Sequence, residues 1–120
     1  MTPEGKVKAR AYKTFKRLGV WYATLNADNG VRAGRPDCVC CVNGFFVAVE
    51  FKATEKNKPT KLQKFEMHNI RCGGGLTLVV NDGNVSHLDS FIYTLQHHVS
   101  FSLKEKLPEH LNALLYTEEI

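Results

Sequence analysis

The sequence of 120 residues lacks the features that define membrane and secreted proteins. No apolar run approaches the ~20 residues that a membrane-spanning helix requires, so we expect no membrane partner. The first 18 residues are studded with Lys and Arg and contain no apolar stretch, which is unlike a secretory signal. We therefore expect a cytoplasmic protein.

The four cysteines lack the spacing of a zinc or disulfide framework, because Cys38, Cys40 and Cys41 lie within one four-residue run and no second C-x-x-C pair follows. Within a β-rich run, Cys40 and Cys41 would point to opposite faces. Free cysteine is a common small buried side chain, and a reducing cytoplasm keeps it free. We expect free thiols; a structural metal bound by Cys38, Cys40, His68 and Cys72 is the alternative.

The length fits one compact domain and leaves no room for two. Apolar residues make up 43% of the chain, an ordinary share for a globular protein, so wholesale disorder is not expected. We expect a single domain over residues 1–120, with a core over about 1–90 and a helical C-terminal segment over about 89–120.

The net charge of +4 is segregated along the chain. Met1–Val20 carries six basic residues and one acid, and Lys52–Lys64 carries five basic residues and one acid. Ser100–Ile120 is acidic, with two basic residues and four acids. Two basic blocks fit a phosphate-rich ligand, and on charge alone they fit solvated helix faces equally well.

Two helices are indicated by their capping residues. Thr2 is a good N-cap for a helix with apolar residues at helical spacing, which ends at Gly19. Thr60 and the glutamine three residues later fit a capping box, opening a helix that ends before Gly73. Between them, Val20–Leu25 is apolar and aromatic enough to form a short strand.

The C-terminal third reads as a second hairpin followed by helices. Leu76–Asn81 and Asn84–Leu88 flank Asp82-Gly83, a typical hairpin turn. Asp89 fits the cap of a helix that extends to about residue 98, and Pro108 the start of a last one. This order of elements predicts an α/β domain with a mixed sheet.

The sharpest expectation concerns the first hairpin. Asp37–Val42 and Phe45–Lys52 are β-rich runs joined by Asn43-Gly44, the pair most typical of a two-residue type I′ turn. Counting outward from that turn places Asp37 opposite Glu50 on the same face of the sheet. Lys52 would project from that face as well, because side chains alternate along a strand.

Two opposed carboxylates destabilise a sheet unless a cation compensates them. A divalent cation would do so, and Mg²⁺ prefers carboxylate oxygens. A metal held by Asp37 and Glu50, with Lys52 next to it, is a plausible hydrolytic centre. An ordinary surface cluster at a strand end is the alternative.

The ordered residues here resemble the PD-(D/E)XK nuclease signature. Gly34-Arg35-Pro36-Asp37 is followed by twelve residues, Glu50-Phe51-Lys52, and Gln63 early in the next helix. This form is most similar to the VRR-NUC (virus-type replication-repair nuclease) branch, over about residues 4–75. The resemblance implies a restriction-endonuclease-like α/β core, a mixed β-sheet flanked by α-helices.

The resemblance also implies roles for individual residues. Asp37 and Glu50 match the metal-binding acids, with the backbone carbonyl of Phe51 as a further ligand, and Lys52 matches the catalytic lysine. Glu4 matches an acid placed near the metal; favouring the helix N-terminus is its other reading. Gln63 matches the glutamine that orients water, lysine or phosphate, and the capping box is its other reading.

What the resemblance implies for activity is a Mg²⁺- or Mn²⁺-dependent endodeoxyribonuclease that hydrolyses backbone phosphodiesters. Stand-alone VRR-NUC proteins are small, often phage-encoded and associated with Holliday junctions and DNA repair. A structure-selective homodimer in a bacterial or phage-infected host cell is therefore expected. The alternatives are a nuclease-fold nucleic-acid-binding protein without catalysis, or a nuclease acting on RNA, flaps or single-stranded DNA.

Two surfaces follow from these expectations. The apolar C-terminal segment would either form the dimer interface or pack on its own sheet, through Leu103, Leu107, Leu111, Leu114 and Leu115. Basic residues would bind DNA phosphates without reading sequence. They are Lys6, Arg32, Arg35, Lys56, Lys58, Lys61 and Lys64.

Overall fold

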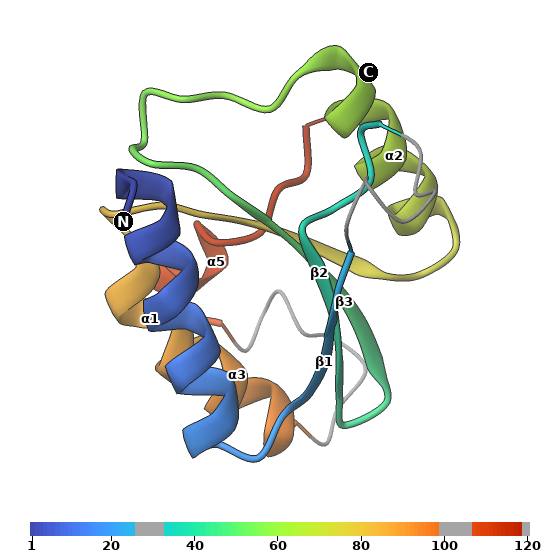
Figure 1. Cartoon of the computed structure of the whole chain (residues 1–120). Coiled ribbons are helices and arrows are strands. Elements are labelled where there is room, and N and C mark those ends of the chain that lie inside the picture. Colours follow the sequence, from blue (N-terminus) through green and yellow to red (C-terminus); the bar gives the residue numbers. More distant parts are fainter. Residues whose placement is uncertain (26–32, 99–106, 119–120) are drawn as a thin grey trace.

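The computed structural model describes residues 1–25, 33–98 and 107–118. Its centre is a four-stranded sheet in the order β1-β2-β3-β4 (Figure 1). The pairs β1–β2 and β2–β3 are antiparallel, and β4 is parallel to β3. The strands are β1 (Trp21–Thr24), β2 (Cys38–Val42), β3 (Phe45–Phe51) and β4 (Leu76–Val80).

Helices cover both faces of the sheet, with α1 and α3 on one side and α2 on the other (Figure 1). They are α1 (Pro3–Arg17), α2 (Lys61–Cys72), α3 (Leu88–Gln96) and the short α5 (Glu109–Asn112), with a 3₁₀ turn, η2 (Val85–His87), before α3. No helix within the described residues is long and apolar enough to cross a bilayer. The expected mixed sheet flanked by helices is confirmed.

The helix α1 begins as its sequence predicts. The Thr2 hydroxyl accepts a hydrogen bond from the Gly5 backbone N–H at 3.0 Å and so satisfies one of the orphan donors of the first turn. Val7, Ala11 and Phe15 recur every four residues and are buried against the sheet. This apolar stripe leaves the basic residues of α1 on its outer side.

The β2–β3 hairpin has the predicted register. Asn43 and Gly44 both have positive φ, 49° and 82°, which a type I′ turn requires. Val42 pairs with Phe45 and, at the other end, Cys38 pairs with Val49. Asp37 therefore lies one residue beyond the end of β2, at the level of Glu50.

The second predicted hairpin is wrong. Residues 85–88 form η2 and the start of α3 instead of a strand. Val85, Leu88, Phe91 and Leu95 are all buried, and their spacing of three or four residues is helical. The Asp82-Gly83 pair closes a turn into a helix here, with the Asn84 amide donating to the Val79 carbonyl at 3.0 Å.

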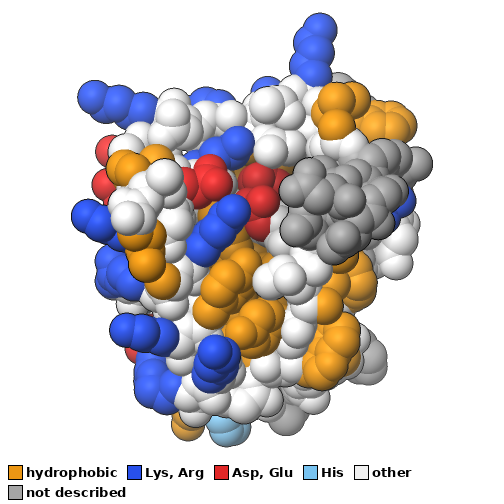
Figure 2. All heavy atoms as spheres, in the orientation of Figure 1, with side chains coloured by type: hydrophobic (Ala, Val, Ile, Leu, Met, Phe, Trp, Pro, Cys, Tyr) orange, Lys and Arg blue, Asp and Glu red, His pale blue; other side chains and the backbone are white. Residues whose placement is uncertain are grey.

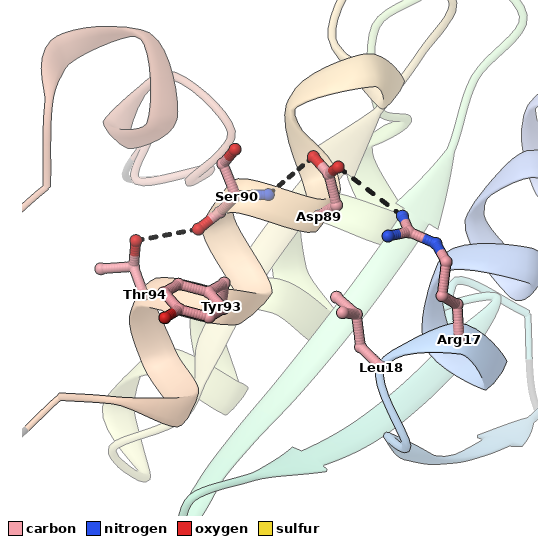
Figure 3. A pocket seen from close by; sticks show the side chains of 6 residues that line it. All are labelled: Arg17, Leu18, Asp89, Ser90, Tyr93 and Thr94. Carbon is pink, nitrogen blue, oxygen red and sulfur yellow. Dashed lines mark hydrogen bonds and ion pairs between the residues drawn. The ribbon is translucent and has the colours of Figure 1, made fainter.

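The expected cap of α3 is also displaced. The helix begins at Leu88 with His87 at the N-cap position, so Asp89 lies inside the first turn. There its carboxylate lies 3.6 Å from the Arg17 guanidinium and ties the end of α1 to the start of α3 (Figure 3).

The C-terminal segment packs on its own sheet. Leu107, Leu111 and Leu114 are buried in the core. Leu115 forms an antiparallel bridge with Leu78, and the Tyr116 N–H donates to the Thr77 carbonyl at 2.7 Å. Leu107, Leu111 and Leu114 therefore belong to the domain core and Leu115 packs against it, as the second expectation for this segment had it; Leu103 lies outside the described residues.

Candidate active site

The predicted acids and lysine meet where β2 begins and β3 ends. Asp37 precedes β2, Glu50 is the penultimate residue of β3, and Lys52 follows β3. The Asp37 Oδ2 atom accepts a hydrogen bond from the backbone N–H of Phe51 at 2.8 Å. One bond thus ties the first acid to the backbone of the E-x-K tripeptide.

Gly34 brings the loop before Asp37 against α2. Its φ is +90°, and a Cβ atom built there would lie 2.8 Å from the Leu62 Cβ atom and 2.9 Å from the Leu62 carbonyl group. Only glycine fits both this backbone conformation and this close approach. The glycine of the Gly34-Arg35-Pro36-Asp37 string therefore positions Asp37 relative to the first turn of α2.

Gln63 both caps α2 and contacts the residues of the site. Its Oε1 atom accepts from the Thr60 backbone N–H at 2.9 Å and completes the capping box. The same oxygen accepts from the Lys52 Nζ atom at 2.9 Å, while its Nε2 atom donates to the Glu50 Oε1 atom at 3.0 Å. A single amide on α2 thus fixes both the lysine and the second acid.

The N-terminal half of α1 contributes a second pair of charges. The Lys8 Nζ atom lies 3.4 Å from Glu4 Oε2 and 3.9 Å from Asp37 Oδ1. Lys8 therefore bridges Glu4 and Asp37, and so links Glu4 to the acidic pair. Lys8 was not anticipated; the available signal was its position four residues after Glu4, which places both on one helix face.

Glu50 is the most perturbed acid of the cluster. It is only 4% exposed, and burial, which disfavours the charged form, raises the pKa of its carboxyl to about 9. The charge of Asp37 and a hydrogen bond with it raise the pKa of Glu50 further, whereas the Lys52 ammonium lowers it. Without an added cation, the Glu50 carboxyl therefore does not ionise readily at neutral pH.

This donor set fits a divalent cation. Two close carboxyls, one of them buried and reluctant to ionise, would both become favourable anions beside a metal. Within the described residues, no three His, Cys, Asp or Glu side chains gather as a metal site, so further ligands would be backbone carbonyls, water or substrate. Mg²⁺ keeps several such ligands.

The cysteine expectations resolve in favour of free thiols. Cys38 and Cys40 are buried, and Cys41 and Cys72 are exposed. The Cys72 Sγ atom lies 3.5 Å from His68 Nε2, one turn back on α2. The alternative of a structural metal bound by Cys38, Cys40, His68 and Cys72 finds no support in the described residues.

The basic residues expected to bind phosphate differ in their surroundings. Arg35 lies 3.6 Å from the Glu66 carboxylate, and Lys64 lies 3.0 Å from the Glu118 carboxylate, so both are ion-paired. Arg32 lies outside the described residues. Figure 2 shows Lys and Arg side chains along the edge of α1 and around a small acidic group. The remaining four are exposed: Lys6, Lys56, Lys58 and Lys61.

Comparison with known proteins bears on the fold that carries this arrangement. No protein-family model matches the sequence, and no curated protein matches it. A solved structure of a VRR_NUC domain superposes on the chain with a TM-score of 0.65 and 28% sequence identity. That match covers 82% of this chain and 100% of the solved chain. The chain is thus similar to a VRR-NUC domain in fold, in agreement with the resemblance of its ordered motif residues, and this similarity supports a nuclease-fold domain.

Proposed function

We propose that the chain is a metal-dependent endonuclease that hydrolyses DNA backbone phosphodiesters. The observation that carries this proposal is the hydrogen-bonded chain from Lys52 through Gln63 to Glu50, opposite Asp37. A surface cluster of charges needs no such positioning, because exposed ion pairs contribute little to stability. An acid held buried with a raised pKa is more typical of a functional site.

In this proposal, Asp37 and Glu50 hold a Mg²⁺ or Mn²⁺ ion, with the Phe51 carbonyl and Glu4 as further candidates. When bound, such an ion lowers the pKa of a coordinated water and polarises a phosphate oxygen. Lys52 offsets the negative charge that develops on the phosphate, and its ammonium has three donors, of which Gln63 takes one. Gln63 is a positioning residue for Lys52 and Glu50.

The proposed substrate is branched DNA, cut by a homodimer. Four lysines are exposed on the segments that flank the site. Lys6 lies on α1, Lys56 and Lys58 on the loop before α2, and Lys61 at the start of α2. Such residues hold phosphates without reading sequence. Each chain offers one such site, and two symmetric cuts across a junction need two.

A cleavage assay tests this proposal. Labelled four-way junction, linear duplex and single-stranded DNA are incubated with Mg²⁺, Mn²⁺ or EDTA, with wild type and Asp37→Ala. The matched control is Asp82→Ala, which removes an exposed acid from the turn after β4. We expect metal-dependent cutting by wild type and Asp82→Ala only, fastest on the junction.

The outcomes separate the alternatives. Cutting in EDTA, or equal cutting by Asp37→Ala, would overturn the metal-dependent mechanism. Binding of DNA without any cutting would favour a nuclease-fold binding protein. Equal cutting of all three substrates, or preference for a single strand, would reject junction selectivity alone.

A further inference from the structure

A pocket of about 260 Å³ lies between the sheet and α2. Its sheet side includes Val39 and Phe46, and its helix side includes Glu66, Asn69 and Ile70. Arg35 and Pro36, from the loop before β2, and Leu25 form the rest of the lining. The pocket thus combines an apolar floor with a guanidinium, a carboxylate and an amide.

Two elements lead from the proposed active site to this pocket. Val39 lies two residues after Asp37 on β2, so its side chain shares the face of Asp37 at a distance of ~7 Å along the strand. Glu66 and Ile70 lie three and seven residues after Gln63 and share its face of α2. A ligand whose phosphate reached the acids would therefore place its neighbouring group in this pocket.

The chemistry of the walls favours a nucleobase over other groups. Phe46 is 50% exposed and offers a ring on which a base can stack. The Arg35 Nε atom lies 3.6 Å from Glu66 Oε2, so the pair offers donors and an acceptor to a base edge. A second phosphate is disfavoured, because the Glu66 carboxylate would repel it.

We propose that this pocket binds an unpaired nucleobase next to the phosphate that is cut. This inference rests on the proposed nuclease function and deepens it: the substrate has at least one unstacked nucleotide at the cleavage position. A fully paired duplex would have to unpair a base to fill the pocket, which disfavours it as a substrate.

A second hollow supplies a control. It has a volume of about 290 Å³ and lies between the C-terminal end of α1 and α3, lined by Arg17, Leu18, Asp89 and Tyr93 among others (Figure 3). Nine residues of α1 separate Arg17 from Lys8, which places this hollow ~13 Å along the helix from the acidic cluster. Tyr93 is 58% exposed, so Tyr93→Ala matches Phe46→Ala in exposure and aromatic loss.

The test is an abasic scan by fluorescence anisotropy in EDTA. Labelled branched DNA carries three unpaired nucleotides at the branch, and each base is removed in turn. We expect one position at which base removal weakens wild-type binding about tenfold, the size expected for one stacked base. Phe46→Ala should lose about tenfold on intact DNA and nothing more on that abasic DNA. Tyr93→Ala should bind as wild type does.

A second variant guards against a purely structural effect. Val39→Phe fills the pocket while adding aromatic surface, so it should weaken binding as Phe46→Ala does if occupancy matters. The inference is overturned if no abasic position weakens binding by wild type, or if the losses of binding from Phe46→Ala and from base removal add. It is also overturned if Val39→Phe binds intact DNA normally while its thermal unfolding is unchanged.

The two proposals fail separately. A protein that cuts DNA with Mg²⁺ but ignores every abasic position would contradict the pocket and leave the nuclease standing. A protein that passes the abasic scan but cuts nothing with Mg²⁺ or Mn²⁺ would contradict the nuclease and leave the pocket standing.

Discussion

At the scale of single residues, Glu50 couples the site to the stability of the fold. Its pKa is raised from 4.5 to about 9 in the folded chain. Below pH 4.5 the carboxyl is protonated in both states, so burial carries no ionisation penalty. As pH rises from there towards about 9, the unfolded state releases this proton and the native state keeps it, so the free energy of unfolding falls.

We predict that Glu50→Gln stabilises the metal-free protein at pH 8. The amide has the shape of the carboxyl, can still accept from Gln63 and cannot ionise, so the free energy of unfolding should rise by about 1–3 kcal/mol. Urea unfolding in EDTA at pH 5 and pH 8 measures this change. Glu109→Gln, at an exposed acid of α5, is the control and should change neither value.

The Glu50→Gln prediction would be contradicted if the variant showed the same loss of stability between pH 5 and pH 8 as wild type. Wild type and Glu50→Gln also test whether Glu50 binds the metal. Mn²⁺ should raise the Tm of wild type and leave the Tm of Glu50→Gln nearly unchanged, because the variant cannot supply the second carboxylate.

At the scale of elements, the start of α2 is both a helix cap and a support for the site. Gln63→Ala removes both functions and should destabilise the protein by about 1 kcal/mol. Gln63→Glu keeps an acceptor for the Thr60 N–H but loses the donor to Glu50, and adds a third carboxylate. We expect near-normal thermal stability and strongly reduced cleavage for Gln63→Glu; normal cleavage would mean that the glutamine only caps the helix.

The loop before β2 makes a second prediction at this scale. Gly34→Ala adds a Cβ atom against Leu62 at a φ of +90°, whereas Gly74→Ala meets no described atom within 4 Å at a φ of +93°. Both substitutions strain the backbone, by ~1 kcal/mol, and only the first adds a clash. Gly34→Ala should therefore lower Tm more and reduce cleavage, while equal losses in Tm would refute the close approach as the reason for glycine.

The elements also show what sequence could and could not predict. The register of Asp37 and Glu50 followed from one turn, because side-chain alternation fixes every later pair. The Asp82-Gly83 pair led to the wrong prediction of a second hairpin. The buried residues after it have helical spacing, and this spacing outweighs the turn signal. Lys8 and the double role of Gln63 depend on tertiary contacts between α1, α2 and the strand ends, which local patterns do not encode.

At the scale of the whole molecule, the C-terminal segment belongs to the domain. Leu111 is 3% exposed, so Leu111→Ala should destabilise the fold by about 2–4 kcal/mol through loss of core packing. At temperatures where Leu111→Ala is folded, sedimentation should still show the proposed dimer. A variant that became monomeric without a fall in Tm would show that this segment forms the interface instead.

The central claim is that Lys52, held by Gln63 beside Asp37 and Glu50, belongs to a metal-dependent nuclease site. The most direct test is single-turnover cleavage of a labelled four-way junction with saturating Mg²⁺. Lys52→Ala should slow cleavage by at least about 10²-fold, the scale of losing one preorganised charge-stabilising group. The exposed control Lys16→Ala should cut at the wild-type rate, and EDTA should stop all cutting. Cleavage by Lys52→Ala at the wild-type rate, with Mg²⁺ or in EDTA, would contradict the account.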